Sequence, residues 1–168
     1  ALSLVLLFAS CKKEECVKTD ADFENYKKNF VDNLWKLNPG WASNVGFHKY
    51  DSVLVVPNAE YSKKFVDFAK TTLDSLETYS IDNLSDNNKT DFYMIKNYAE
   101  GSLFSIKELK SDTWNPSDYN VCGAFAEILN GSYDTLETRL KNFATKMDNI
   151  PAYYEAAKAN IKNPTIEH

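Results

Sequence analysis

Apolar residues recur at helical spacing along most of the chain. From Thr19 onward they return at steps of three and four residues, which is the period of a helix with one buried face. The first stripe consists of Phe23, Tyr26, Phe30, Val31 and Leu34. Thr19 and Asp20 are its candidate N-caps, and it ends before Asn38. A short helical segment over residues 41–45 should follow, closed by Gly46.

Two longer stripes predict a pair of helices. The first covers residues 59–79, with an apolar face opposite a charged face, and the second begins near Ser85 after a polar turn. A short connection favours antiparallel packing, so the two should form a long-helix hairpin. Gly101 interrupts the second stripe, which predicts either a close helix contact or a kink there.

The last third predicts three more helices. One covers residues 117–129, and the next is capped by Ser132 or Asp134. The inward-facing residues of this second helix are Leu136, Leu140, Phe143 and Met147. The third starts near Pro151. Residues 51–57 are the only β-like run and are expected to form an extended connector. The predicted fold class is therefore all-α, an irregular array of about five to six helices that includes the antiparallel hairpin.

The first eleven residues predict a targeting segment. Residues 1–10 are apolar or small, and Cys11 is followed at once by four charged residues. Such a run has about the length of a signal-peptide core and is too short to span a membrane. Phe8-Ala9-Ser10-Cys11 resembles a lipobox, so Cys11 is the predicted lipidation site. Residues 1–10 would be a truncated lipoprotein signal peptide, 11–19 a charged tether and 20–168 the N-terminal helical region of a larger domain. The alternative for residues 1–10 is a buried strand or the start of a helix.

A lipid on Cys11 would place the protein in the cell envelope of a Gram-negative bacterium, with the membrane as a partner, as an outer-membrane lipoprotein. The next four residues are Lys-Lys-Glu-Glu. They resemble a charged export tag, which would lead to exposure at the cell surface, but they would serve equally well as a solvated tether. Both interpretations stay open.

Composition limits the classes of partner and the chemistry. The net charge is −5 with acids and bases interspersed, so there is no electrostatic footprint for nucleic acid. Aromatic residues make up 14% of the chain, which suits core packing first and contact with sugars or peptides second. Cys16 and Cys122 could form a disulfide in an oxidising compartment. Two unpaired thiols are the favoured alternative, because Cys16 lies in a charged leader and Cys122 in an apolar stretch where buried thiols are common.

The chain lacks every catalytic motif that we can recognise. Its two histidines are His48, predicted as a surface loop residue, and His168 at the last position. There is no His-Glu-x-x-His, no cysteine pair with metal spacing, no phosphate loop and no Gly-x-Ser-x-Gly elbow. We therefore assign no catalytic residue, no metal ligand and no cofactor to these 168 residues.

Two clusters carry a family resemblance. The first contains Trp35, Pro39, Ala42, Gly46, Phe47, His48, Tyr50 and Asp51. The second contains Trp114, Asn115, Pro116, Tyr119, Leu136, Glu137, Arg139, Leu140, Ile150, Pro151, Ala156, Ala157, Asn160, Ile161 and Pro164. In this order and at these spacings they resemble the N-terminal part of the bacterial family catalogued as domain of unknown function 885. The similarity runs from about Asp22 to the C-terminus.

The resemblance implies a much longer, mostly helical protein that is often exported or lipid-anchored. It also implies a zinc-peptidase-like catalytic half, whose His-Glu-x-x-Pro-Gly-His type of motif would lie well downstream. Zinc would then belong to the full-length parent, and this region would form a wall or lid of the cleft for a peptide substrate. Its partner would be the rest of its own chain. Nothing up to His168 matches that motif, so no catalytic residue is carried over.

The same clusters have a structural interpretation. The tryptophans would be core anchors and the prolines would mark helix boundaries; these residues are Trp35, Trp114, Pro39, Pro116 and Pro151. Gly46 would sit in a turn that needs positive φ. Arg139 would be a surface residue paired with Glu137 or its neighbours or, if buried, would need a carboxylate partner.

Two main hypotheses about function follow. The first is an N-terminal helical fragment of a zinc-peptidase-like lipoprotein, inactive by itself. The alternative is a self-sufficient helical lipoprotein that binds a peptide, a glycan or a protein partner through exposed aromatic residues. The candidate aromatic residues are Tyr50, Tyr79, Tyr153 and Tyr154. The reading frame beyond His168 distinguishes the two.

Overall fold

The computed structural model describes residues 18–163, 165 and 166, and this part of the chain is all-α, as predicted. The predicted leader, with Cys11 and Cys16, lies outside the described residues. The described part contains seven α-helices, because the short segment after the first helix forms a helix of its own. They are α1 (Asp20–Leu37), α2 (Pro39–Asn44), α3 (Ala59–Leu76), α4 (Asp86–Phe104), α5 (Gly123–Asn130), α6 (Leu136–Met147) and α7 (Ile150–Asn160).

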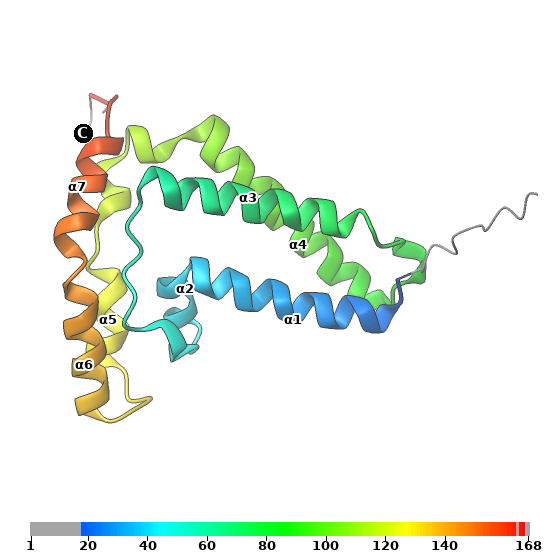
Figure 1. Cartoon of the computed structure of the whole chain (residues 1–168), viewed down its shortest axis with the longest axis horizontal. Helices are drawn as coiled ribbons and strands as arrows, with labels where there is room; N and C mark the ends of the chain where they lie inside the picture. Colours follow the sequence, from blue (N-terminus) through cyan, green and yellow to red (C-terminus); the bar gives the residue numbers. More distant parts are fainter. Residues whose placement is uncertain (1–17, 164, 167–168) are drawn as a thin grey trace, which may run out of the picture.

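The helices form two groups that run in different directions (Figure 1). The long group consists of α1, α3 and α4, and α3 and α4 form the predicted antiparallel hairpin. The short group consists of α5, α6 and α7. The small helix α2 and the connector to α3 lie between the groups, so residues from both groups come together at this junction.

Side-chain caps explain where several helices begin. The Thr19 hydroxyl accepts the Asp22 N–H at 3.2 Å, and the Asp22 carboxylate accepts the Thr19 N–H at 2.8 Å, which completes a capping box on α1. Ser85 caps α4 as expected. The predicted caps of α6 are wrong, because the hydroxyl that accepts an amide of its first turn belongs to Thr135.

The core of the long group is the larger of the two and is rich in aromatic residues. Its buried members are Phe23, Phe30, Leu34, Leu76, Tyr79, Leu84, Phe92 and Ile95. The Phe23 ring is fully buried and meets the Tyr79 ring edge-on, with centroids 5.1 Å apart. The expectation that Tyr79 is an exposed binding aromatic is therefore wrong.

The core of the short group is smaller and includes the connector. Leu54 packs there with Val121 and Phe125, and the partly buried residues around them come from α5, α6 and α7. The helix predicted for residues 117–129 is interrupted. It begins as the 3-10 helix Pro116–Tyr119, and α5 starts only at Gly123. The interruption follows from an Asx turn, in which the Asn120 side-chain oxygen accepts the Cys122 N–H at 3.0 Å.

The apolar face predicted to point inward from α6 lies largely in solvent. The side chains of Leu136, Leu140 and Met147 are 61%, 49% and 45% exposed. Phe143 alone among the four predicted residues packs against the core of the short group. The amphipathic pattern of α6 is real, but the described residues do not cover its apolar face.

Two smaller expectations also change. A Cβ added at Gly101 would meet no neighbour within 4 Å, so this glycine does not mediate a close helix contact. The irregular part of the long helix lies further on, in the π-helical turn Ser105–Leu109, which ends at Lys110 with φ of 50°. Cys122 is exposed rather than buried.

Candidate functional site

The polar centre of the junction is the carboxylate of Asp51, which is fully buried. Its Oδ1 accepts a hydrogen bond from the Ser43 hydroxyl at 2.5 Å. Its Oδ2 accepts the Tyr133 hydroxyl and lies 3.1 Å from His48 Nδ1. A carboxylate taken out of water is stable only when donors surround it in this way. The three donors come from α2, from the turn after it and from the loop between α5 and α6, so Asp51 ties these segments together.

His48 is held in a defined orientation. Its ring stacks on the Tyr133 ring, with parallel planes and centroids 3.3 Å apart. When Nδ1–H donates to the Asp51 carboxylate, the free lone pair of a neutral imidazole is on Nε2. Burial and the adjacent carboxylate raise the pKa of the Tyr133 phenol, so this hydroxyl remains a donor. The predicted surface loop residue is thus a partly buried residue of the 3-10 helix His48–Tyr50.

A buried lysine lies on the other side of the junction. Lys146 in α6 is 1% exposed, and its Nζ donates to the Ala124 carbonyl at 2.7 Å. The ammonium also lies 5.6 Å from the centroid of the Phe125 ring, within the range of a cation–π contact. Burial lowers the pKa of Lys146, and the negative charge of Asp51 opposes this effect. The junction therefore contains one buried anion and one buried cation.

Ser43, Tyr133 and Lys146 are not among the residues predicted from the sequence. Lys146 could have been noticed, because it follows Phe143 by three residues and therefore falls on the apolar face of its helix. Tyr133 and Asp51 are 82 residues apart in the sequence, and no local sequence pattern predicts their contact.

The two predicted anchor tryptophans differ. Trp35 is partly buried against the core of the long group, and its ring meets Trp41 edge-on at 5.1 Å. Trp114 lies in neither of the two described cores. It is half-buried, and its indole N–H donates to the Leu109 carbonyl at 3.0 Å, which closes the turn after the π-helical segment.

The prolines predicted to mark helix boundaries lie at helix starts, and the predicted turn glycine lies in a turn. Pro39 is the first residue of α2, Pro116 begins a 3-10 helix, and Pro151 is the second residue of α7. Gly46 has φ of 86°, the left-handed conformation that the turn after α2 requires. These four residues position the segment that carries His48 and the helices around it.

Arg139 acts on the backbone of a neighbouring helix. Its Nη1 donates to the carbonyls of Ile128 and Leu129, at 2.9 and 3.0 Å, in the last turn of α5. A positive charge is favourable at a helix C-terminus. The structure records no ion pair between Arg139 and Glu137 or another described carboxylate, so the predicted surface pair is replaced by a helix cap.

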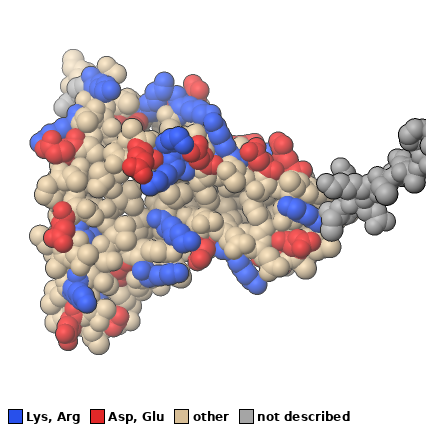
Figure 2. Space-filling view, in the orientation of Figure 1, with Lys and Arg blue, Asp and Glu red and all other residues tan. Residues whose placement is uncertain are grey.

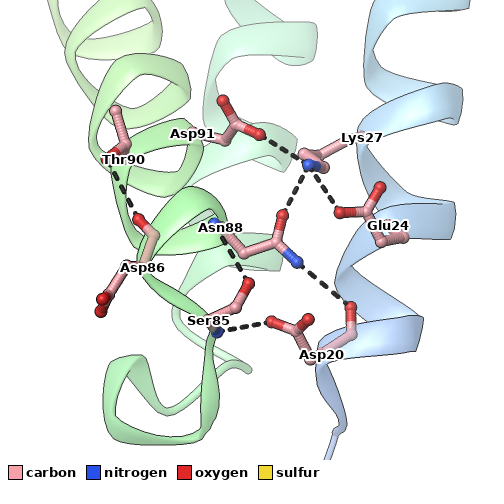
Figure 3. A network of polar contacts seen from close by, with 8 residues as sticks. All are labelled: Asp20, Glu24, Lys27, Ser85, Asp86, Asn88, Thr90 and Asp91. Carbon is pink, nitrogen blue, oxygen red and sulfur yellow. Dashed lines mark hydrogen bonds and ion pairs between the residues drawn. The ribbon is translucent and has the colours of Figure 1, made fainter.

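A second polar network lies between α1 and α4 (Figure 3). Lys27 donates to the Asn88 side-chain oxygen at 2.5 Å and to the Asp91 carboxylate at 2.6 Å, and it pairs with Glu24 at 2.9 Å. Burial works against the charged amine, but the hydrogen bonds to Asp91 and Glu24 outweigh it and raise the pKa of Lys27. The network fastens one end of the long group, and its lysine is fully engaged.

Neither the distribution of surface charge nor a group of metal ligands marks a further site among the described residues. On the face shown in Figure 2, acidic and basic side chains are interspersed over both helix groups. Within the described ranges, no three His, Cys, Asp or Glu side chains are grouped so that they could hold a metal ion.

Comparison with known proteins identifies the family. Residues 39–166 match the family described as bacterial protein of unknown function (DUF885). The chain belongs to this family. The resemblance found in the two sequence clusters is thereby confirmed. No curated protein shows significant similarity to the chain.

A solved structure has the same fold as this DUF885 chain. It is that of a "putative lipoprotein of unknown function" from Shewanella oneidensis, with 38% sequence identity and a TM-score of 0.83. The similarity covers 90% of this chain but only 27% of the other. The chain thus spans about a quarter of the length of this relative. None of the helices that the structure describes combines the length and apolar character needed to cross a bilayer.

Proposed function

We propose that this chain is the N-terminal helical part of an exported, lipid-anchored DUF885 protein with a zinc-peptidase-like catalytic part further along the polypeptide. In this proposal the present region is scaffold and one wall of a peptide-binding cleft. The observation that carries it is the match to 90% of this chain and only 27% of a much longer relative described as a lipoprotein.

The exposed face of α6 supports the scaffold role. Leu136 and Leu140 are apolar, adjacent on the helix surface and largely exposed among the described residues. Contiguous apolar surface of this kind marks an interaction site in a folded protein. In the proposal, the rest of the same polypeptide covers it.

The lipid anchor is tested by labelling the full-length protein in a Gram-negative host with a palmitate analogue. Wild type and the Cys16→Ser control should carry label and sediment with outer membranes, whereas Cys11→Ser should carry none. Protease treatment of intact cells then separates surface exposure from a periplasmic location. Label on Cys11→Ser would contradict lipidation at this residue.

The catalytic proposal is tested on the full-length protein and on the 168-residue chain in parallel. After dialysis, we expect about one zinc per full-length molecule by elemental analysis and none bound stoichiometrically by the short chain. Only the full-length protein should cleave a mixed peptide library, followed by mass spectrometry. Full-length protein without zinc and without cleavage would overturn the proposal, and so would turnover by the short chain.

The alternative of a self-sufficient binding lipoprotein has less support. Of its four candidate aromatic residues, Tyr79 is buried and Tyr153 packs against the core of the short group. Tyr154 is the one that the structure describes as well exposed, at 40%. A stop codon within a few residues of His168 would favour this alternative over the peptidase-like parent.

A further inference from the structure

A cavity of about 250 Å³ lies where the two helix groups meet. Its walls come from the end of α1, from α2, from the connector and from α3, α5, α6 and α7. Trp41, Tyr61 and Tyr153 supply aromatic surface, and Leu54 and Val55 supply aliphatic surface. Cavities that combine apolar walls with a few polar groups are typical of small-molecule sites.

Lys146 is the charged residue in this wall. An ammonium has three N–H donors. Among the described residues, one of them is used, in the bond to the Ala124 carbonyl, and Ala124 lines the same cavity. Two donors therefore have no acceptor among the described residues, although Lys146 is only 1% exposed to solvent. Leaving buried donors of a charged group unpaired is costly, which indicates that something else accepts from them.

The nearby anion does not account for this lysine. The described residues contain no ion pair within 4.0 Å between Lys146 and Asp51, and the Asp51 carboxylate already receives the Ser43 and Tyr133 hydroxyls and faces His48. The Tyr61 hydroxyl is also engaged, because it donates to the Leu37 carbonyl at 3.0 Å. The ammonium is thus a buried, charged wall group with spare hydrogen-bonding capacity.

We infer that this cavity binds a molecule with one carboxylate and an apolar or aromatic body, such as the C-terminal residue of a peptide. The carboxylate of the ligand accepts hydrogen bonds from the two spare N–H groups of Lys146, and the aromatic walls of the cavity contact the apolar or aromatic part of the ligand. A single ammonium matches a single negative charge, whereas a phosphate group would need more donors than this wall supplies. The inference goes beyond the proposed function, because it involves neither zinc nor catalysis.

The test uses a matched pair of ligands and the full-length protein. N-acetylphenylalanine carries the required carboxylate, and N-acetylphenylalanine amide replaces it with a neutral group of nearly the same shape. Titration calorimetry should show binding of the acid, with the amide weaker by about tenfold or more, the effect of losing a charge-assisted hydrogen bond. Equal affinity for acid and amide, or no binding of the acid at millimolar concentration, would overturn the inference.

Variants then locate the site. Lys146→Met should reduce affinity for the acid by about tenfold and leave the amide unchanged, because the variant removes the charge and keeps a flexible side chain only one atom shorter. Lys141→Met is the control, since Lys141 is exposed on the same helix. Circular dichroism verifies that both variants fold. If Lys146→Met does not fold, the ligand pair is compared on the 168-residue chain, which lacks the proposed zinc-binding part. Unchanged affinity of folded Lys146→Met for the acid would place the binding elsewhere, whatever the outcome of the zinc and cleavage experiments.

Discussion

The two helix groups use the same amphipathic pattern with different results. In the long group, the apolar stripes of α1, α3 and α4 meet in a core around Phe23, and Val31 and Met94 beside it stay 40% and 66% exposed. In the short group, the described core is small, and Leu129, Leu136 and Leu140 remain about half exposed or more. Helical periodicity specifies which face of a helix is apolar, but it does not specify what covers that face.

The groups also differ in how they use buried charge. The Lys27 network joins two helices and satisfies its lysine with side chains of the described chain. At the junction, Asp51 is satisfied, whereas Lys146 is not. The Lys27 network is therefore a structural fastening of α1 to α4, whereas the junction has the character of a binding site.

The largest effect is expected in the core around Phe23. Phe23→Ala should lower the free energy of unfolding by about 3–5 kcal/mol, because the ring is fully buried and the cavity left behind cannot collapse completely. Denaturant unfolding measures this. The control is Tyr93→Ala on α4, where the ring is 56% exposed and the cost should stay within about 0.5 kcal/mol. Similar losses for the two variants would contradict the burial of Phe23 in a well-packed core.

A somewhat smaller effect is expected at the junction. Asp51→Ala removes the common acceptor of Ser43 and Tyr133 and should lower the free energy of unfolding by about 2–3 kcal/mol. Asp51→Asn should cost less, since its amide oxygen still accepts a hydrogen bond. Thermal and chemical unfolding of the two variants would show this order. If Asp51→Ala were as stable as the unmodified protein, Asp51 would not tie the junction together.

A pH-dependent effect is expected at the fastened end of the long group. The Ser85 backbone N–H, which donates to Asp20 at 2.7 Å, and the Asn88 side chain lower the pKa of the Asp20 carboxyl (Figure 3). Because the folded-state pKa is lowered, this stabilisation is present above the unfolded pKa and is lost as pH falls through the folded value. In Asp20→Asn, the melting temperature should therefore depend less on pH below the ordinary aspartate pKa. Parallel pH profiles for wild type and variant would refute this contribution.

The smallest effect is expected on the open face of α6. In the 168-residue chain, Leu140→Ser should change the free energy of unfolding by no more than about 0.5 kcal/mol, because the side chain is already half in solvent. In the full-length protein the same variant should cost more if the remaining polypeptide covers this face. If Leu140→Ser changed the free energy of unfolding equally in both proteins, the rest of the polypeptide would not cover this face, and one support of the proposed scaffold role would be lost.

Local signals explain what could be predicted from the sequence. The helical period placed the long hairpin, and the hydroxyls of Thr19 and Ser85 marked two helix starts because capping is a contact within one turn. Gly46 was recognisable as a turn residue for the same reason. Thr135 was missed because several capping residues are adjacent in that loop, and tertiary packing decides among them.

The junction could not be predicted in this way. Asp51, Tyr133 and Lys146 are brought together by the arrangement of the two helix groups, and only Lys146, on the apolar face of α6, carries a local signal of burial. The exposure of Leu136 was also unpredictable, since it depends on surface that lies outside its own helix.

The bond between Tyr133 and Asp51 bears on how the chain folds. It closes a loop of 82 residues, whereas the hairpin of α3 and α4 joins neighbouring segments. Contacts of large sequence separation form slowly, because the chain entropy lost in closing them is not recovered until the closure is complete. The hairpin is therefore expected to assemble first and the Asp51 contacts last. Early in refolding, α3 and α4 should already protect their amides from exchange while Tyr133 is still free.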